Sequence, residues 1–88
     1  MSYRVGLSKS ASTFIRHLDK EMMTRVLDKI AWLGNNFETV TPVRLKGKYS
    51  GLYKFRIGNY RLVYSIDHQN QELFVLFFDH RKNVYRKP

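Results

Sequence analysis

A lysine and two arginines lie close together within residues 52–66, and their types and spacing are suited to chemistry on a phosphodiester. Lys54 and Arg56 precede a Gly-Asn turn signal at 58–59, and Arg61 follows it. Cleavage of RNA without a metal ion needs a base for the 2′-hydroxyl, positive charge around the phosphorane and a proton for the departing 5′-oxygen. Neighbouring arginines disfavour the ammonium form of a lysine, so Lys54 is a candidate base, while arginines stay charged and hold phosphate.

A two-residue turn at 58–59 also determines which residues face each other across the predicted hairpin. In that register Arg56 lies directly opposite Arg61, although like charges placed so cost on the order of a few tenths of a kcal/mol to 1 kcal/mol. An anion between the two guanidinium groups converts this repulsion into charge-assisted hydrogen bonds. The alternative is a solvated sheet face whose cations spread into water.

The same register separates the hairpin into two faces. We expect helices to cover the mostly apolar face, which consists of Tyr53, Phe55, Ile57, Tyr60, Leu62 and Tyr64. The opposite face, which we expect to be uncovered, consists of Lys54, Arg56, Arg61, Val63 and Ser65.

His80 is a second candidate for proton transfer, because it follows an apolar segment and precedes Arg81. A histidine that is hydrogen-bonded at a strand end is the alternative, and the residues alone do not decide between Lys54 and His80 as base. The three histidines are too far apart in sequence for a zinc motif, and neither a carboxylate cluster nor a glycine-rich phosphate loop is present. We therefore expect no metal and no cofactor.

The net charge of +9 is unevenly distributed, since the basic segments 44–61 and 81–88 contain no acidic residue. Such segregation predicts a polyanionic partner, with nucleic acid ahead of an acidic protein or a membrane surface. The alternative is that the charge serves solubility only. Beyond the residues already named, the candidate binding residues are Arg44, Lys46, Lys48, Lys82, Arg86 and Lys87.

The remaining sequence predicts the elements that hold the hairpin in place. Alternating apolar residues at 3–7 indicate a short opening strand. Apolar positions spaced by three and four over 10–33 predict helix, and Asp19 as a cap favours a helical hairpin broken near 18–20. The Gly-Asn-Asn sequence at 34–36 ends it.

After Pro42 the pattern changes to strands. Residues 43–47 predict an edge strand, and the apolar segment 72–78 predicts a central strand. Eighty-eight residues with 43% apolar side chains make one domain, 1–88. Because the chain has no cysteine, no signal-peptide pattern and no apolar run long enough for a bilayer, we expect a soluble cytoplasmic protein with no membrane partner.

The segments "LKGKYSGLYKFRIGNYRLVYSI" and "FFDHRKNVYR" resemble the RelE/ParE superfamily of toxins from bacterial toxin–antitoxin pairs, and the resemblance covers nearly the whole chain. It implies an α+β fold with a short N-terminal strand and a helical hairpin packed on one face of a curved antiparallel sheet. It also implies the activity of the RelE branch, a ribosome-dependent endoribonuclease that cuts mRNA in the A site by 2′-hydroxyl transesterification without metal.

The resemblance also implies roles for individual residues. Lys54 would be the base, Arg61 would hold the scissile phosphate, Arg81 would stabilise phosphate or leaving group, and Tyr85 would stack on or orient a base. Arg56 stands where the family often has lysine, so the base role rests on Lys54 alone or is shared with His80.

Two other activities are considered within the superfamily: a ParE-like, non-enzymatic inhibitor of DNA gyrase, and a degenerate toxin that only binds nucleic acid. The expected partners are mRNA on the 70S ribosome and an acidic, partly disordered, RelB-like antitoxin. The resemblance further implies that the toxin–antitoxin complex binds operator DNA through the antitoxin.

Overall fold

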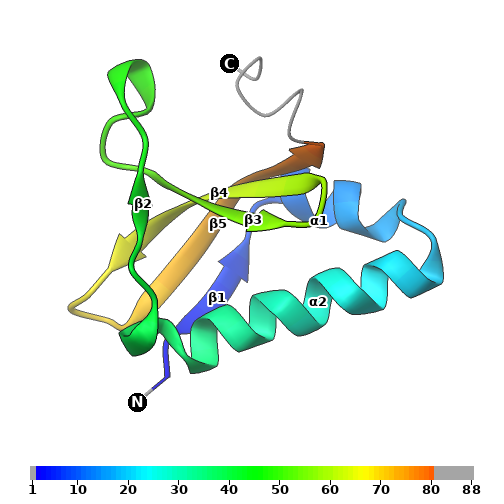
Figure 1. Cartoon of the computed structure of the whole chain (residues 1–88), viewed down its shortest axis with the longest axis horizontal. Coiled ribbons are helices and arrows are strands. Elements are labelled where there is room, and N and C mark those ends of the chain that lie inside the picture. The colour runs from blue at the N-terminus through cyan, green and yellow to red at the C-terminus, as the bar shows by residue number, and fades with distance from the viewer. Residues whose placement is uncertain (1, 81–88) are drawn as a thin grey trace.

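The computed structural model describes residues 2–80, which form a five-stranded sheet with two helices packed on one face (Figure 1). The elements are β1 (Arg4–Leu7), α1 (Lys9–Arg16), α2 (Lys20–Asn35), β2 (Val43–Arg44), β3 (Tyr53–Ile57), β4 (Tyr60–Asp67) and β5 (Glu72–His80), with short 3-10 helices η1 (Phe37–Thr39) and η2 (Gly47–Tyr49). The strand order is β1-β5-β4-β3-β2. The predicted α+β architecture is confirmed.

One strand pair differs from the expected antiparallel arrangement. β1 pairs in parallel with β5, whereas the other neighbouring strands are antiparallel, so the sheet is mixed. A parallel partner requires a long crossover connection. Between β1 and β5 the chain passes through both helices and then through β2, β3 and β4, so the connection is long enough.

The two helices are separated where the sequence predicted a break. The side chain of Asp19 accepts a hydrogen bond of 2.8 Å from the amide of Met22, which caps the first turn of α2. Ser8 caps α1 in the same way, and its hydroxyl also donates to the carbonyl of Leu76 at 2.6 Å. The cap of α1 thus also attaches this helix to β5.

The end of α2 lies against the first strand. The amide of Tyr3 donates to the carbonyl of Gly34 at 2.9 Å, and a Cβ at Gly34 would lie 2.6 Å from the carbonyl oxygen of Tyr3. Only glycine permits this approach. The glycine that helps end the helix therefore also allows α2 to pack closely on β1.

The hairpin has the predicted register. Arg56 is opposite Arg61, and Lys54 is opposite Val63. Gly58, the first turn residue, has a φ of 58°, whereas Asn59, the second, does not have a positive φ. This combination fits a type II′ turn, which has glycine at its first position. The six residues predicted for the apolar face of the hairpin all belong to, or pack against, the main core beneath the helices.

The opposite face of the sheet is partly covered, which the sequence did not predict. Leu45 and Val63 are buried there, and Tyr49, Leu52 and Phe77 pack against them. Leu45, Tyr49 and Leu52 come from the segment between β2 and β3, which lies on the side of the sheet away from α2 (Figure 1). The predicted edge strand 43–47 is reduced to two residues, because the chain leaves the sheet after Arg44.

Tyr64 is fully buried in the main core, and its hydroxyl has no hydrogen-bond partner within residues 2–80. Burial, and to a smaller extent the neighbouring Tyr53, raise the pKa of Tyr64 from 10.0 to about 12. The folded state therefore retains this proton at pH values where the unfolded chain loses it.

A raised pKa in the folded state predicts alkaline destabilisation. The contribution of Tyr64 to stability is complete below pH 10.0 and is lost as the pH rises to about 12. The loss amounts to about 3 kcal/mol. Tyr64→Phe removes the buried hydroxyl, so it keeps or raises stability at neutral pH by up to about 1 kcal/mol and removes this part of the alkaline loss. Urea unfolding of both proteins across this pH range measures the difference, and equal alkaline losses would contradict the prediction.

Candidate functional site

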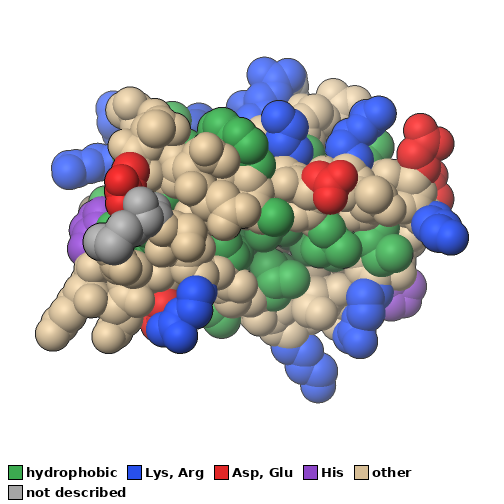
Figure 2. Space-filling model, turned by 90° about the horizontal axis from the view of Figure 1, so that it is seen from below, with side chains coloured by type: hydrophobic (Ala, Val, Ile, Leu, Met, Phe, Trp, Pro, Cys, Tyr) green, Lys and Arg blue, Asp and Glu red, His purple; other side chains and the backbone are tan. Residues whose placement is uncertain are grey.

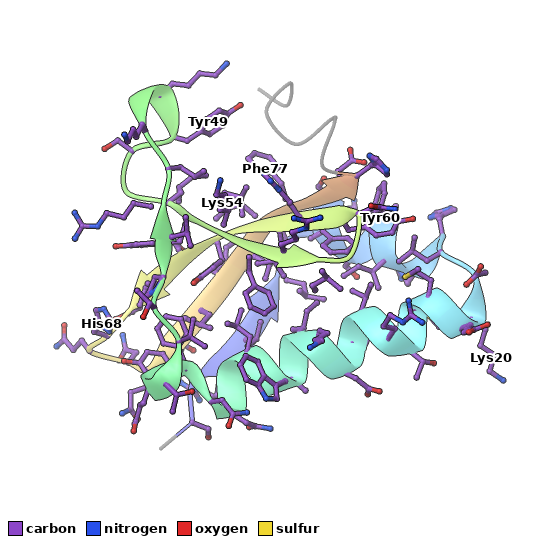
Figure 3. All side chains as sticks on the ribbon, in the orientation of Figure 1. Lys20, Tyr49, Lys54, Tyr60, His68 and Phe77 are labelled. Atoms are coloured by element: carbon purple, nitrogen blue, oxygen red, sulfur yellow. The ribbon has the colours of Figure 1, made fainter. Side chains whose placement is uncertain are left out.

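Three cations of the predicted site project from the face of the β3–β4 hairpin that lies away from the helices. Arg56 is exposed, whereas Lys54 and Arg61 are half-buried. The Nε of Arg56 donates to the carbonyl of Gly58 at 3.0 Å, which directs this side chain along the turn. Figure 3 shows Lys54 on the side of the sheet opposite α2, where Tyr49 and Phe77 also lie. The structure therefore brings these three cations together.

A buried carboxylate lies in the same row. Asp79 on β5 pairs with Arg61 on β4, which in turn pairs with Arg56, so these side chains share one face of the sheet. Asp79 is 6% exposed and accepts a hydrogen bond of 2.6 Å from the amide of His80. Arg61 thus has a like charge on one neighbouring strand and an opposite charge on the other. Sequence reasoning missed Asp79, whose only signal was an acid at the end of an apolar strand.

His80 lies on the other face of the sheet. It pairs with Tyr60, and the two rings are 5.8 Å apart, close to the stacked pair formed by Tyr60 and Phe78. Lys54 and His80 are therefore on opposite faces and are not brought together. Of the two candidate bases, Lys54 is the one that lies with the arginines.

The other predicted binding residues fall into two groups. Arg44, Lys46 and Lys48 are exposed on β2 and the segment that follows it. Arg44 pairs with Tyr53, which packs on the helical side, so Arg44 does not share the face of Lys54. The ammonium of Lys48 lies 5.3 Å from the centre of the Tyr49 ring. The remaining predicted residues, Arg81, Lys82, Tyr85, Arg86 and Lys87, lie outside the described residues.

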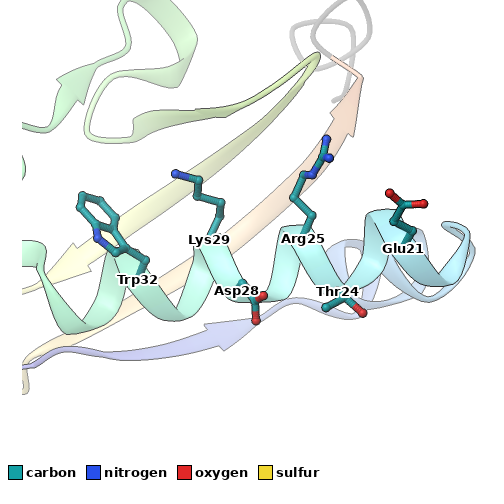
Figure 4. A pocket seen from close by; sticks show the side chains of 6 residues that line it. All are labelled: Glu21, Thr24, Arg25, Asp28, Lys29 and Trp32. Carbon is teal, nitrogen blue, oxygen red and sulfur yellow. The ribbon is translucent and has the colours of Figure 1, made fainter.

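The helical side of the molecule has a different surface. Basic and acidic side chains are interspersed there around an apolar strip (Figure 2). A shallow groove of about 510 Å³ on α2 is lined by Glu21, Thr24, Arg25, Asp28, Lys29 and Trp32 (Figure 4). Because this groove contains both signs of charge, it is less suited to a polyanion than the hairpin face.

Two further observations concern residues 2–80. They contain no group of three or more His, Asp or Glu side chains placed to hold a metal ion. None of their helices has the length and apolar character needed to cross a membrane.

The sequence of this chain matches a known protein family. The family described as "ParE toxin of type II toxin-antitoxin system, parDE" matches residues 5–85. The toxin RelG of Mycobacterium tuberculosis (strain ATCC 25618 / H37Rv) is 37% identical over 43 residues, which make up 49% of this chain and 49% of RelG. The match thus spans about half the length of this curated relative.

Solved structures share the fold over most of the chain. The RelBE2 toxin–antitoxin complex of Mycobacterium tuberculosis contains a chain with a TM-score of 0.81 at 24% identity, covering 92% of this chain and 93% of that one. The archaeal RelE–RelB complex of Pyrococcus horikoshii OT3 gives 0.72 at 28% identity, covering 92% and 97%. The isolated RelE toxin of E. coli gives 0.69 at 22% identity, covering 97% and 93%.

The facing arginines predict that the hairpin is more stable with one of them removed. Arg56→Gln should raise the free energy of unfolding by roughly 0.2–1 kcal/mol at low ionic strength, because it removes a like-charge pair. The gain should shrink at high salt, which screens the repulsion. Lys46→Gln removes the same charge from an exposed position outside this pair and serves as the control. Equal changes in the two variants, measured by denaturant unfolding at low salt, would contradict the prediction.

Proposed function

The chain belongs to the ParE toxin family, within the RelE/ParE superfamily of type II toxin–antitoxin systems, and we propose that it cleaves mRNA on the ribosome. The observation that carries this proposal is the placement of Lys54, Arg56 and Arg61 on one face of the hairpin, opposite the helices. These cations suit a phosphodiester better than a neutral or cationic ligand. The proposed place of action is the cytoplasm, where mRNA is translated.

The proposed reaction is an internal transesterification. The side-chain nitrogen of Lys54 takes the proton of a 2′-hydroxyl, and the 2′-oxygen forms a bond to the adjacent phosphorus as the bond to the 5′-oxygen breaks. Arg56 and Arg61 donate hydrogen bonds to the phosphorane oxygens, where negative charge accumulates. The departing 5′-oxygen takes up a proton from water, and Lys54 passes the proton it accepted to the hydroxide that is left. The products carry a 2′,3′-cyclic phosphate and a 5′-hydroxyl.

The remaining predicted residues have supporting roles in this proposal. Arg44, Lys46 and Lys48 hold the RNA backbone or ribosomal RNA beside the hairpin, together with Lys82, Arg86 and Lys87. Arg81 adds positive charge near the phosphate, and Tyr85 stacks on a base. His80, which lies on the opposite face, is not needed as base in this arrangement. No step requires a metal.

Gyrase inhibition of the ParE kind is the alternative function. The description of the matching family, which names ParE and parDE, favours it. The acid in the row of Arg61 also favours it, since Asp79 offsets part of the positive charge that a phosphate would meet. Expression of the protein separates the two functions: translation stops first if it cuts mRNA, and DNA replication stops first if it inhibits gyrase.

An antitoxin is the proposed protein partner. The similar structures from Mycobacterium tuberculosis and Pyrococcus horikoshii OT3 are complexes of a toxin with its antitoxin. For this chain we propose an acidic, partly disordered, RelB-like antitoxin that orders on binding and covers the basic hairpin face. In this proposal the complex binds operator DNA through the antitoxin.

Substitution of the proposed base and of the phosphate-binding arginine tests the activity. Lys54→Ala should lower the rate of mRNA cleavage on ribosomes by about 10²–10⁴-fold, because it removes a proton acceptor. Arg61→Ala should lower the rate by about 10²–10³-fold, because it removes a hydrogen-bond donor to the negatively charged oxygens of the phosphorane. Primer extension on translated messages measures the rates. Lys20→Ala, at the start of α2, is the control and should cut at the wild-type rate. Cleavage at the wild-type rate by the Lys54→Ala and Arg61→Ala variants would contradict the proposal.

We expect the proposed antitoxin to inhibit mRNA cleavage through contacts between opposite charges. Addition of the product of the neighbouring gene should stop cleavage, and the affinity of the complex should fall as salt is raised, because the contact is between opposite charges. Titration of the purified antitoxin into the cleavage reaction measures this. A complex that forms but leaves cleavage unchanged would contradict the proposed binding face.

A further inference from the structure

Two phenylalanine rings project from β5 on the same face of the sheet as the site cations. Phe74 pairs with Ser65 and is 45% exposed, and Phe77 pairs with Val63 and is partly buried. Both lie on the side away from the helices, whereas Val75 and Phe78 are buried in the main core. The open face of β5 is therefore aromatic.

A bulge in β5 places Phe77 on this face. Val63 pairs with Phe77 and Tyr64 pairs with Val75, so Leu76 is an extra residue with no partner of its own in the ladder. Without the extra residue, strict alternation from Phe74 would turn position 77 toward the helices. Bulges commonly redirect a side chain next to a functional site.

The environments of these two rings differ from those of the other phenylalanines. The described phenylalanines on the helical side, Phe14, Phe37, Phe55 and Phe78, each contact at least one other aromatic ring. Within residues 2–80, neither Phe74 nor Phe77 has such a contact. A Cβ at Gly6 would lie 3.3 Å from the Phe74 ring, so the absence of a side chain there makes room for it.

The position of Phe77 relates it to the cations. Lys54, Val63 and Phe77 form one row across three neighbouring strands, and Arg61 lies in the next row. Two strand spacings separate Phe77 from Lys54, about 10 Å along the row. Figure 3 shows Phe77 and Lys54 on the same side of the sheet. A nucleotide whose phosphate lies at Arg61 can thus place its base toward β5.

We propose that Phe77, with Phe74 beyond it on β5, is a stacking site for unpaired bases of single-stranded RNA whose backbone is held by the hairpin cations. The inference rests on the proposed function and extends it to a site for bases. Aromatic rings beside a basic groove bind single strands in this way, because every base has a flat π-face. The bulge then serves to aim Phe77 at the RNA.

The charge around the rings favours RNA over a protein helix as the occupant. Lys54, Arg56 and Arg61 share this face, with Asp79 as the acid among them. A strand of RNA satisfies both the cations and the rings, whereas an apolar protein segment would contact the rings alone. Loss of protein binding without loss of RNA binding is accordingly an outcome that the experiment must detect.

The experiment measures binding of a short, fluorescein-labelled single-stranded RNA by anisotropy at several salt concentrations, and binding of the purified antitoxin to the same variants. Phe77→Leu keeps an apolar contact with Val63 but removes the ring, and Phe74→Leu is the second variant. Trp32→Leu, an exposed aromatic on α2, is the matched control. A second RNA of the same length carries abasic riboses, so it retains the phosphates and loses the bases. Thermal unfolding confirms that each variant is folded.

Phe77→Leu should weaken binding of the normal RNA by about 5-fold to 100-fold, with an unchanged salt slope, because stacking is lost and phosphate contacts remain. Trp32→Leu should bind like wild type, and the abasic RNA should bind equally to wild type and to Phe77→Leu. Wild-type affinity of both Phe variants for the normal RNA would overturn the inference, and so would a loss that persists with the abasic RNA. A defect confined to antitoxin binding would identify a protein-docking surface and would also overturn it.

Failure of the stacking site can be distinguished from failure of the proposed mRNA cleavage. If wild type cuts translated mRNA but Phe77→Leu and Phe74→Leu bind RNA normally, the function holds and the stacking site is wrong. If wild type neither binds RNA with a salt-dependent affinity nor cuts mRNA, both are wrong.

Discussion

The register of the β3–β4 hairpin is the constraint on which the site depends. A two-residue turn that begins with Gly58 leaves one pairing for the strands, and that pairing places Arg56 against Arg61. A shift of β3 by one residue against β4 would turn Lys54 and Arg56 toward the helices and leave Arg61 on the other face. Ile57, which is buried in the main core, opposes such a shift, because the shift would turn it to the other face of β3. The main core therefore maintains an arrangement of cations that is unfavourable in itself.

The two faces of the sheet differ in composition and burial. The helical face carries most of the buried apolar surface and most of the aromatic ring contacts. The other face has only the small cluster around Leu45 and Val63, and it presents cations and two phenylalanine rings. Asp79 lies within this face and moderates its charge. The facing arginines and the exposed Phe74 ring make this surface unfavourable for folding stability, as side chains at functional sites commonly are.

The predictability of each feature follows from the range of the interactions that produce it. The turn at Gly58, the cap at Asp19 and the helical pattern of α2 depend on neighbouring residues, so the sequence predicts them well. The parallel pairing of β1, the bulge at Leu76, and the fold of segment 45–52 over Val63 depend on contacts between distant segments. Strand alternation alone could not place His80 and Asp79 relative to the hairpin, because the bulge reverses the faces of β5 after Val75. For that reason the sequence left two candidate bases, and the structure groups only Lys54 with the arginines.

The chemical nature of the cut RNA end tests the central claim most directly. If Lys54 and the facing arginines perform a transesterification, messages cut on ribosomes by the purified protein carry a 2′,3′-cyclic phosphate on the upstream fragment and a 5′-hydroxyl on the downstream one. Mass spectrometry of the fragments distinguishes these ends from a 3′-hydroxyl and a 5′-phosphate. The account predicts the cyclic phosphate, with divalent ions unnecessary for the chemical step. Fragments that end in a 3′-hydroxyl, or translated messages that stay intact, would contradict it.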